Sequence, residues 1–112
     1  MIDPDAPTPA DPKFAFWRHF VVPGLRPGED VVKHGNVVTE YLAPGPKEDS
    51  GPHRYLFLLF EEPAGLKLTK EDVGGEEFVQ RRSFPAADFV ARHGLKLAGV
   101  NWMTCAWDGY AQ

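Results

Sequence analysis

Two histidines and two aspartates are the residues of this chain most able to do chemistry. His19 and His53 each stand among aromatic and apolar neighbours, and Asp3 and Asp5 lie close to the first residue. Carboxylates and imidazoles together can bind a metal ion, transfer protons in catalysis, or form an anion site in which a carboxylate orients a charged imidazole. The residue types alone leave these three interpretations open.

Spacing disfavours a metal site, because none of these residues shows the short paired spacing typical of zinc ligands. Catalysis by a nucleophile is also disfavoured. Ser50 and Ser83 are the two serines, and neither lies in a Gly-x-Ser-x-Gly motif. Ser50 is three residues from His53, and on an extended loop we expect that spacing to keep its hydroxyl away from the imidazole. We therefore expect no catalytic residue, no metal and no cofactor.

An anion site needs donors: imidazole and backbone N–H groups and a phenol hydroxyl. The chain supplies these donors, and the glycines of Gly45-Pro46 and Gly51-Pro52 allow the backbone to approach a ligand closely. On composition, unrelated surface and core roles for the same residues are about as well supported.

The elements that must position these residues are mainly strands. Alternation predicts a strand over 16–22 and another over 36–42, and the doubly apolar run at 55–60 is typical of a central strand covered on both faces. A helix is predicted over 83–94, with Ser83 as its cap, and a last strand over 100–107. His93 then lies in the last turn of the helix, and His34 in a turn.

The segments between these elements are predicted to be loops. Residues 1–12 contain prolines at positions 4, 7, 9 and 12, which exclude a helix or a central strand. Residues 43–52 read as a loop, and 67–77 as a loop or a single helical turn. The double basic step Arg81-Arg82 is interpreted as a solvated edge.

Composition limits the class of protein. The 112 residues are 43% hydrophobic, which predicts one domain over 1–112. A net charge of -4, with no basic cluster, disfavours nucleic acid as a partner. Cys105 is the single cysteine, so no internal disulfide is possible. No transmembrane segment or signal peptide is recognisable, and a cytoplasmic protein without integral membrane association is expected.

Three separated motifs in one order resemble the phosphatidylethanolamine-binding protein family. They are Asp3-Pro4-Asp5-Ala6-Pro7 with Asp11-Pro12, then Trp17-Arg18-His19-Phe20, then Gly51-Pro52-His53-Arg54-Tyr55, and Trp107-Asp108-Gly109-Tyr110 resembles the family's closing strand. The resemblance implies a mainly β fold: an antiparallel β-sandwich with a large sheet, a smaller sheet and short peripheral helices. It also implies a small pocket at one end of a sheet that binds phosphate-type anions or phospholipid head groups.

Carried over by motif, the expected ligand-binding residues are Asp3, Ala6, Pro7, Trp17, His19, Pro46, His53, Tyr55 and Tyr110, with Asp5 and Arg54 as supporting residues. The family resemblance also implies a non-enzymatic role, with a phosphorylated small molecule or head group as the partner. The alternative is a protein inhibitor or signalling adaptor acting on a serine carboxypeptidase or a kinase.

The resemblance carries one departure. Family members have further strands before the Asp-Pro-Asp motif, so residues 1–112 are expected to correspond to the C-terminal two thirds of the family's domain. An exposed sheet edge, uncovered apolar surface and self-association are the expected consequences.

Overall fold

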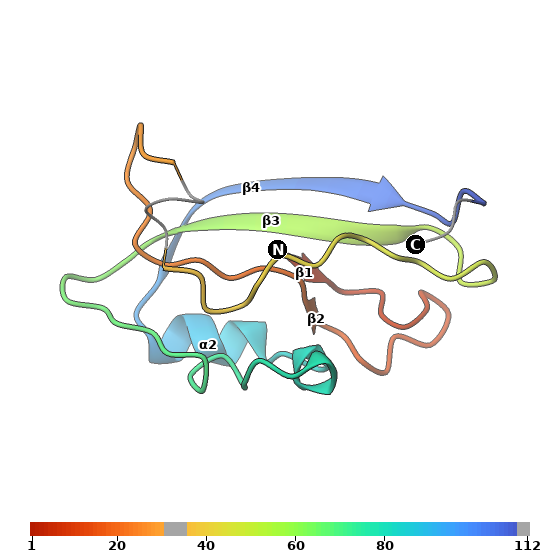
Figure 1. Cartoon of the computed structure of the whole chain (residues 1–112), viewed down its shortest axis with the longest axis horizontal. Helices are drawn as coiled ribbons and strands as arrows, with labels where there is room; N and C mark the ends of the chain where they lie inside the picture. The colour runs from red at the N-terminus through yellow and green to blue at the C-terminus, as the bar shows by residue number, and fades with distance from the viewer. Residues whose placement is uncertain (31–35, 110–112) are drawn as a thin grey trace.

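The computed structural model describes residues 1–30 and 36–109. Its elements in chain order are β1 (Ile2–Asp3), β2 (Trp17–Arg18), β3 (His53–Glu61), a 3-10 helix η1 (Phe78–Arg81), α2 (Ala86–Arg92) and β4 (Lys96–Cys105). The strands form one antiparallel sheet in the order β2-β1-β3-β4. In Figure 1 the two long strands β3 and β4 run side by side, with α2 against one face of the sheet. A mainly β, antiparallel fold with little helix is thus confirmed.

The long hairpin of β3 and β4 is the backbone of the fold. Its register pairs His53 with Cys105 at one end and Glu61 with Lys96 at the other, with an irregularity between Leu59 and Phe60. Residues directly opposite each other share a face of the sheet. β3 covers the predicted strand at 55–60, whereas β4 begins four residues before the predicted strand at 100–107 and ends two residues before its end.

The core lies on the face of the sheet that α2 covers. It consists of Ile2, Val38, Leu68, Val73, Phe84 and Phe89, and Leu56 and Leu58 of β3 pack against it. Phe57 and Leu59 point to the opposite face by strand alternation, and both are exposed. The prediction that β3 is covered on both faces is therefore wrong for this half of the strand.

The other predictions were less accurate in extent. Of the strand predicted over 16–22, only Trp17–Arg18 is regular, and the strand predicted over 36–42 is reduced to an isolated bridge between Val21 and Thr39. α2 lies within the predicted helix, but Pro85 occupies the N-cap position and Ser83, with φ 54°, makes no capping bond. Residues 67–77 form turns, and η1 follows them.

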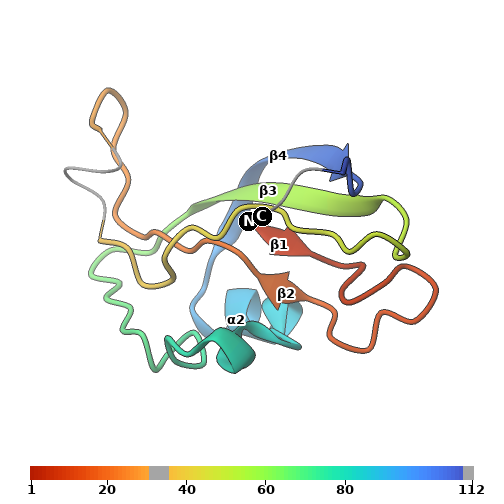
Figure 2. The same cartoon turned by 45° about the vertical axis from the view of Figure 1, so that its right-hand side comes forward.

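β1 and β2 are short because prolines and polar turns flank them. β1 nevertheless lies between β2 and β3, with Ile2 opposite both Arg18 and Leu56 (Figure 2). This position brings the first residues of the chain next to the start of β3, where His53 stands.

Candidate functional site

The centre of the site is a buried carboxylate–imidazole pair. Asp3 in β1 accepts a hydrogen bond from Nδ1 of His53 in β3, at 2.7 Å, and each side chain is 4% exposed. The second oxygen of Asp3 accepts the backbone N–H of Asp5 at 2.7 Å. These bonds fix the proton of neutral His53 on Nδ1 and direct Nε2 away from Asp3.

Two further rings surround this pair. Tyr55 is 1% exposed, stacks against His53 at 6.1 Å between ring centroids, and meets the edge of His19 at 5.2 Å. Burial raises the pKa of Tyr55, so its hydroxyl keeps its proton and remains a donor.

His19 reaches the site from the segment that follows β2. Its Nδ1 donates to the carbonyl of Leu42 at 2.6 Å, which leaves Nε2 as the nitrogen open to a ligand. Burial lowers the pKa of His19, although the bond to Leu42 and the charge of Asp3 oppose the shift. His19 is therefore neutral near pH 7 and gains a donor only when it is protonated.

Asp5 and Arg54 hold the loop around this centre. The carboxylate of Asp5 accepts the backbone N–H of Arg54 at 2.7 Å and two guanidinium bonds at 2.8 and 3.0 Å. The hydrogen bond from the Arg54 side chain lowers the pKa of Asp5. The pair joins the first loop to the start of β3. Both carboxylate oxygens of Asp5 bond to Arg54.

The wall residues named from the motifs differ in burial and in packing. Ala6 and Pro46 are buried, and Pro7 is half-buried and follows a cis peptide bond. Trp17 packs against Phe78 at 5.0 Å in an edge-on contact. Tyr110 lies outside the described residues.

The expectation that Ser50 stays away from His53 is wrong. Its hydroxyl lies 3.0 Å from Nε2 of His53, so that Asp3, His53 and Ser50 are linked in the order of a nucleophilic triad. However, the hydroxyl also lies 3.0 Å from the carbonyl of Lys47 and 3.2 Å from that of Gly51, and Ser50 is buried. Because a hydroxyl has a single proton, these acceptors compete with His53 for it.

Two arginines support the site by hydrogen bonds that the sequence did not predict. Arg18 is 1% exposed and donates to the Thr39 hydroxyl and to three backbone carbonyls, those of Val73, Gln80 and Gly75. Arg81 donates to the carbonyls of Arg18 and His19, at 3.1 and 3.2 Å, and to that of Glu40 at 3.0 Å. The interpretation of Arg81 as a solvated edge residue is wrong.

The signal for these arginines was weak. Arg18 lies opposite Ile2 of the core, but nothing in the sequence showed which carbonyls would receive its guanidinium. Those acceptors lie 55 to 62 residues away along the chain.

The described ranges, 1–30 and 36–109, bear on metal binding and on membrane insertion. They contain no group of three or more His, Cys, Asp or Glu side chains placed to hold a metal ion. No helix within them is long and apolar enough to cross a membrane.

The sequence profile of one protein family matches residues 1–102, and its description is "Phosphatidylethanolamine-binding protein". Among solved structures, the chain is similar to a phosphatidylethanolamine-binding protein from Plasmodium vivax, with a TM-score of 0.70 and 26% identity, over 96% of this chain and 61% of that one. It also resembles the solution structure of CG7054, with a TM-score of 0.66 and 31% identity, over 95% and 59%.

A carboxypeptidase Y inhibitor, solved in complex with its cognate proteinase, shares the fold with a TM-score of 0.69 and 24% identity, over 96% of this chain and 57% of the inhibitor. The chain thus spans about three fifths of the length of each of these solved structures.

Proposed function

We propose that this chain, which belongs to the phosphatidylethanolamine-binding protein family, binds small phosphate-type anions of the phospholipid head-group kind at the cluster of Asp3, His19, His53 and Tyr55. The observation that carries the proposal is the buried Asp3–His53 pair with a second imidazole and a phenol beside it. Cytoplasmic residence stays an expectation from the sequence.

The chemistry of the cluster favours an anion over a cation. When His53 is protonated, it keeps its bond to Asp3 through Nδ1, and Nε2 becomes a second donor. Nε2 of His19 gains a proton in the same way, while its Nδ1 remains bound to Leu42. With the Tyr55 hydroxyl, the cluster then offers three donors to a tetrahedral oxyanion. The Ser50 hydroxyl competes with the anion for Nε2 of His53, because its oxygen can accept from Nε2 while its proton goes to the carbonyl of Lys47 or Gly51.

The test is a titration with phosphoethanolamine, followed by NMR, of the unmodified chain and of His19→Ala and His53→Ala. Each histidine contributes a charge-assisted hydrogen bond of about 1.5–3 kcal/mol, so each variant should bind roughly tenfold more weakly or worse. His93→Ala is the matched control, because His93 lies at the end of α2 and packs against Phe89. Equal affinity in all four proteins would rule out the proposed site.

The pH dependence provides an independent test with sulfate, an anion whose charge is constant over the range. Binding requires protonated imidazole, so affinity should fall as pH rises. Because burial lowers the pKa of His19, the part of the loss due to this residue should occur below its ordinary pKa of 6.5. In His19→Ala that part should disappear. A sulfate affinity that is constant from about pH 5 to about pH 8 would contradict the proposal.

A role as a protein inhibitor is the second candidate, and the observation in its favour is the shared fold with an inhibitor bound to its cognate proteinase. That this chain also inhibits a proteinase is a proposal. Assays of a serine carboxypeptidase with increasing amounts of the chain test it directly. An unchanged rate of peptide hydrolysis at a large excess of the chain would exclude inhibition of that enzyme. The proposal of an anion site would not be affected.

A further inference from the structure

The ring of His19 is held by a segment that is distant in the sequence. Nδ1 of His19 donates to the carbonyl of Leu42 at 2.6 Å, and the N–H of Leu42 donates to the carbonyl of His19 at 2.9 Å. This reciprocal pair orients the imidazole and keeps the proton of the neutral ring on Nδ1. The tautomer of His19 therefore depends on where the backbone at Leu42 lies.

Sheet pairing gives the contact between His19 and Leu42 little support. In the part of the chain that the structure describes, one isolated bridge joins the two segments, between Val21 and Thr39. That bridge lies three residues before Leu42, and the backbone between them belongs to no strand. A regular ladder therefore does not set the position of the Leu42 carbonyl.

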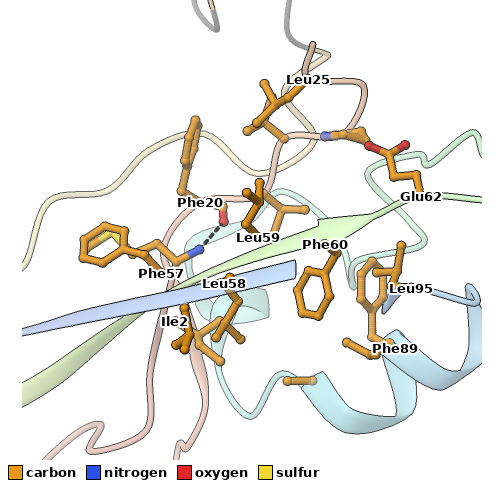
Figure 3. Close-up of a pocket in the computed structure, with 18 of the residues that line it drawn as sticks. Ile2, Phe20, Leu25, Phe57, Leu58, Leu59, Phe60, Glu62, Phe89 and Leu95 are labelled. Carbon is orange, nitrogen blue, oxygen red and sulfur yellow. Dashed lines mark hydrogen bonds between the residues drawn. The ribbon is translucent and has the colours of Figure 1, made fainter. Parts of the chain in front are cut away.

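The β1 side of the His19 segment holds its main chain. The carbonyl of Met1 accepts the N–H groups of His19 and Phe20, and the terminal ammonium donates to the carbonyl of Phe20 at 2.8 Å, which is the dashed line in Figure 3. The side chain of Phe20 lines a cavity of about 560 Å³. Because these bonds join main-chain atoms, they fix the path of the chain but not the orientation of the imidazole.

Arg81 of η1 closes this arrangement from the other side. Its Nη1 donates to the carbonyls of Arg18 and His19, at 3.1 and 3.2 Å, and its Nη2 donates to the carbonyl of Glu40 at 3.0 Å. The rigid planar guanidinium thus joins the backbone that carries His19 to the backbone two residues before Leu42. It sets the separation of the two segments between which the ring is bound.

We propose that Arg81 is a positioning residue for His19: its guanidinium holds the Leu42 carbonyl against the imidazole and so fixes the tautomer and orientation of the ring. The consequence for binding rests on the anion site proposed above, in which Nε2 of His19 meets the ligand. A ring that leaves Leu42 no longer directs Nε2 toward that ligand. Arg81 thus contributes to affinity without touching the anion.

The charge of Arg81 has an effect that is separate from its geometry. Burial lowers the pKa of His19, and the positive charges of Arg81 and the terminal ammonium also lower it, whereas the bond to Leu42 and the charge of Asp3 oppose the shift. A lysine at position 81 keeps the positive charge but has no planar fork. Arg81→Lys therefore separates positioning from electrostatics.

Ring-nitrogen NMR shifts test the proposal on the full chain without any anion. At about pH 8, where histidine is neutral, the unmodified chain should show one tautomer of His19, with the proton on Nδ1. Arg81→Lys should show a mixture of both tautomers, whereas the ring shifts of His53 should stay the same. Arg82→Lys is the matched control, because Arg82 is exposed and its Cζ lies 4.3 Å from the ring centroid of Phe14. It should leave His19 unchanged.

Sulfate binding measures the functional consequence. At about pH 6, Arg81→Lys should bind sulfate about fivefold more weakly than the unmodified chain, and Arg82→Lys should bind it equally well. A mixture of tautomers together with unchanged sulfate affinity would support the positioning of His19 by Arg81. It would count against His19 as an anion donor, so the two proposals can fail separately.

Two results would overturn the positioning role. A single tautomer of His19 with the proton on Nδ1 in Arg81→Lys would show that Leu42 holds the ring without the guanidinium. Altered ring shifts of both His19 and His53 in that variant would indicate a general loss of packing. If the lysine variant does not fold, Arg81→Gln, which keeps a shorter amide donor, takes its place in the same measurement and should give the same mixture of tautomers.

Discussion

At the scale of the single residue, Arg18 shows how a buried cation supports the site without touching it. All three of its guanidinium nitrogens donate to oxygen atoms, and three of the four acceptors are backbone carbonyls from the segment 73–80. Burial lowers its pKa to about 10, so it stays charged at neutral pH. Arg18 therefore ties β2, and through it His19, to that segment.

Arg18→Lys should lower the free energy of unfolding by about 2–4 kcal/mol, because a lysine ammonium cannot reach this planar set of acceptors and leaves buried carbonyls unpaired. Urea unfolding measures the change. Arg26→Lys, at an exposed position, is the control and should change stability by less than about 0.5 kcal/mol. Equal stability of the two variants would contradict a specific role of the Arg18 guanidinium in stability.

The amino group of Met1 gives a prediction on pH. Burial lowers its pKa from 8.0 to about 6, so the folded chain binds fewer protons than the unfolded chain between these values. Stability should consequently fall by about 2 kcal/mol as pH drops from about 8 to about 6, and the contribution should be constant outside that window. Unfolding of the free and the amino-acetylated chain across this range measures it. Acetylation should remove the slope, and an identical slope in both would contradict the assignment to Met1.

At the scale of the element, the segment before η1 depends on Gly75. This residue has φ 103°, its carbonyl accepts from Arg18, and a Cβ there would lie 2.1 Å from Oε1 of Gln80. The same Gln80 oxygen accepts the N–H of Glu77 in the capping box of η1. A side chain at position 75 would therefore displace the Gln80 amide from its bond to Glu77.

Gly75→Ala should destabilise the chain by about 2–3 kcal/mol, through backbone strain and displacement of Gln80. Gly65→Ala is the control, because Gly65 also has a positive φ, 78°, but open space around its Cβ position. It should cost about 1 kcal/mol. Thermal unfolding of both variants separates the cost of a positive φ from the cost of the contact with Gln80. An equal loss of stability in the two variants would show that Gln80 moves aside at no cost.

The elements also show what sequence alone can predict. The apolar run at 55–60 was recognised because its pattern is local, and the three motifs located Asp3, His19 and His53. The alternation at 16–22 overestimated β2, since pairing there depends on the short β1 on one side. The bonds of Ser50 and Arg81 depend on loop conformation and on carbonyls distant in sequence, and neither has a periodic signature.

At the scale of the whole molecule, β4 is the outermost strand of the sheet in the described part of the chain and carries uncovered apolar side chains. Trp102 lies opposite Leu56 and Val100 opposite Leu58, so both belong to the face that α2 covers. They are nevertheless 63% and 60% exposed. A long edge strand with apolar side chains favours pairing with other molecules.

Trp102→Lys should therefore reduce self-association of the chain, because a charge on an edge strand opposes strand pairing and a large aromatic surface is removed. Sedimentation velocity over a range of concentrations measures it, and the weight-average mass should fall toward the monomer by about twofold if the starting species is a dimer. Phe78→Lys is the control, since Phe78 is 60% exposed but lies in η1 beside Trp17 of β2, at the edge of the sheet opposite β4. If Phe78→Lys dissociates the chain and Trp102→Lys does not, association proceeds through the face that carries η1. A monomer at all concentrations would contradict the prediction that this edge drives self-association. The N–H of Trp102 is then sufficiently occupied by the Asn101 amide, which accepts it at 2.8 Å.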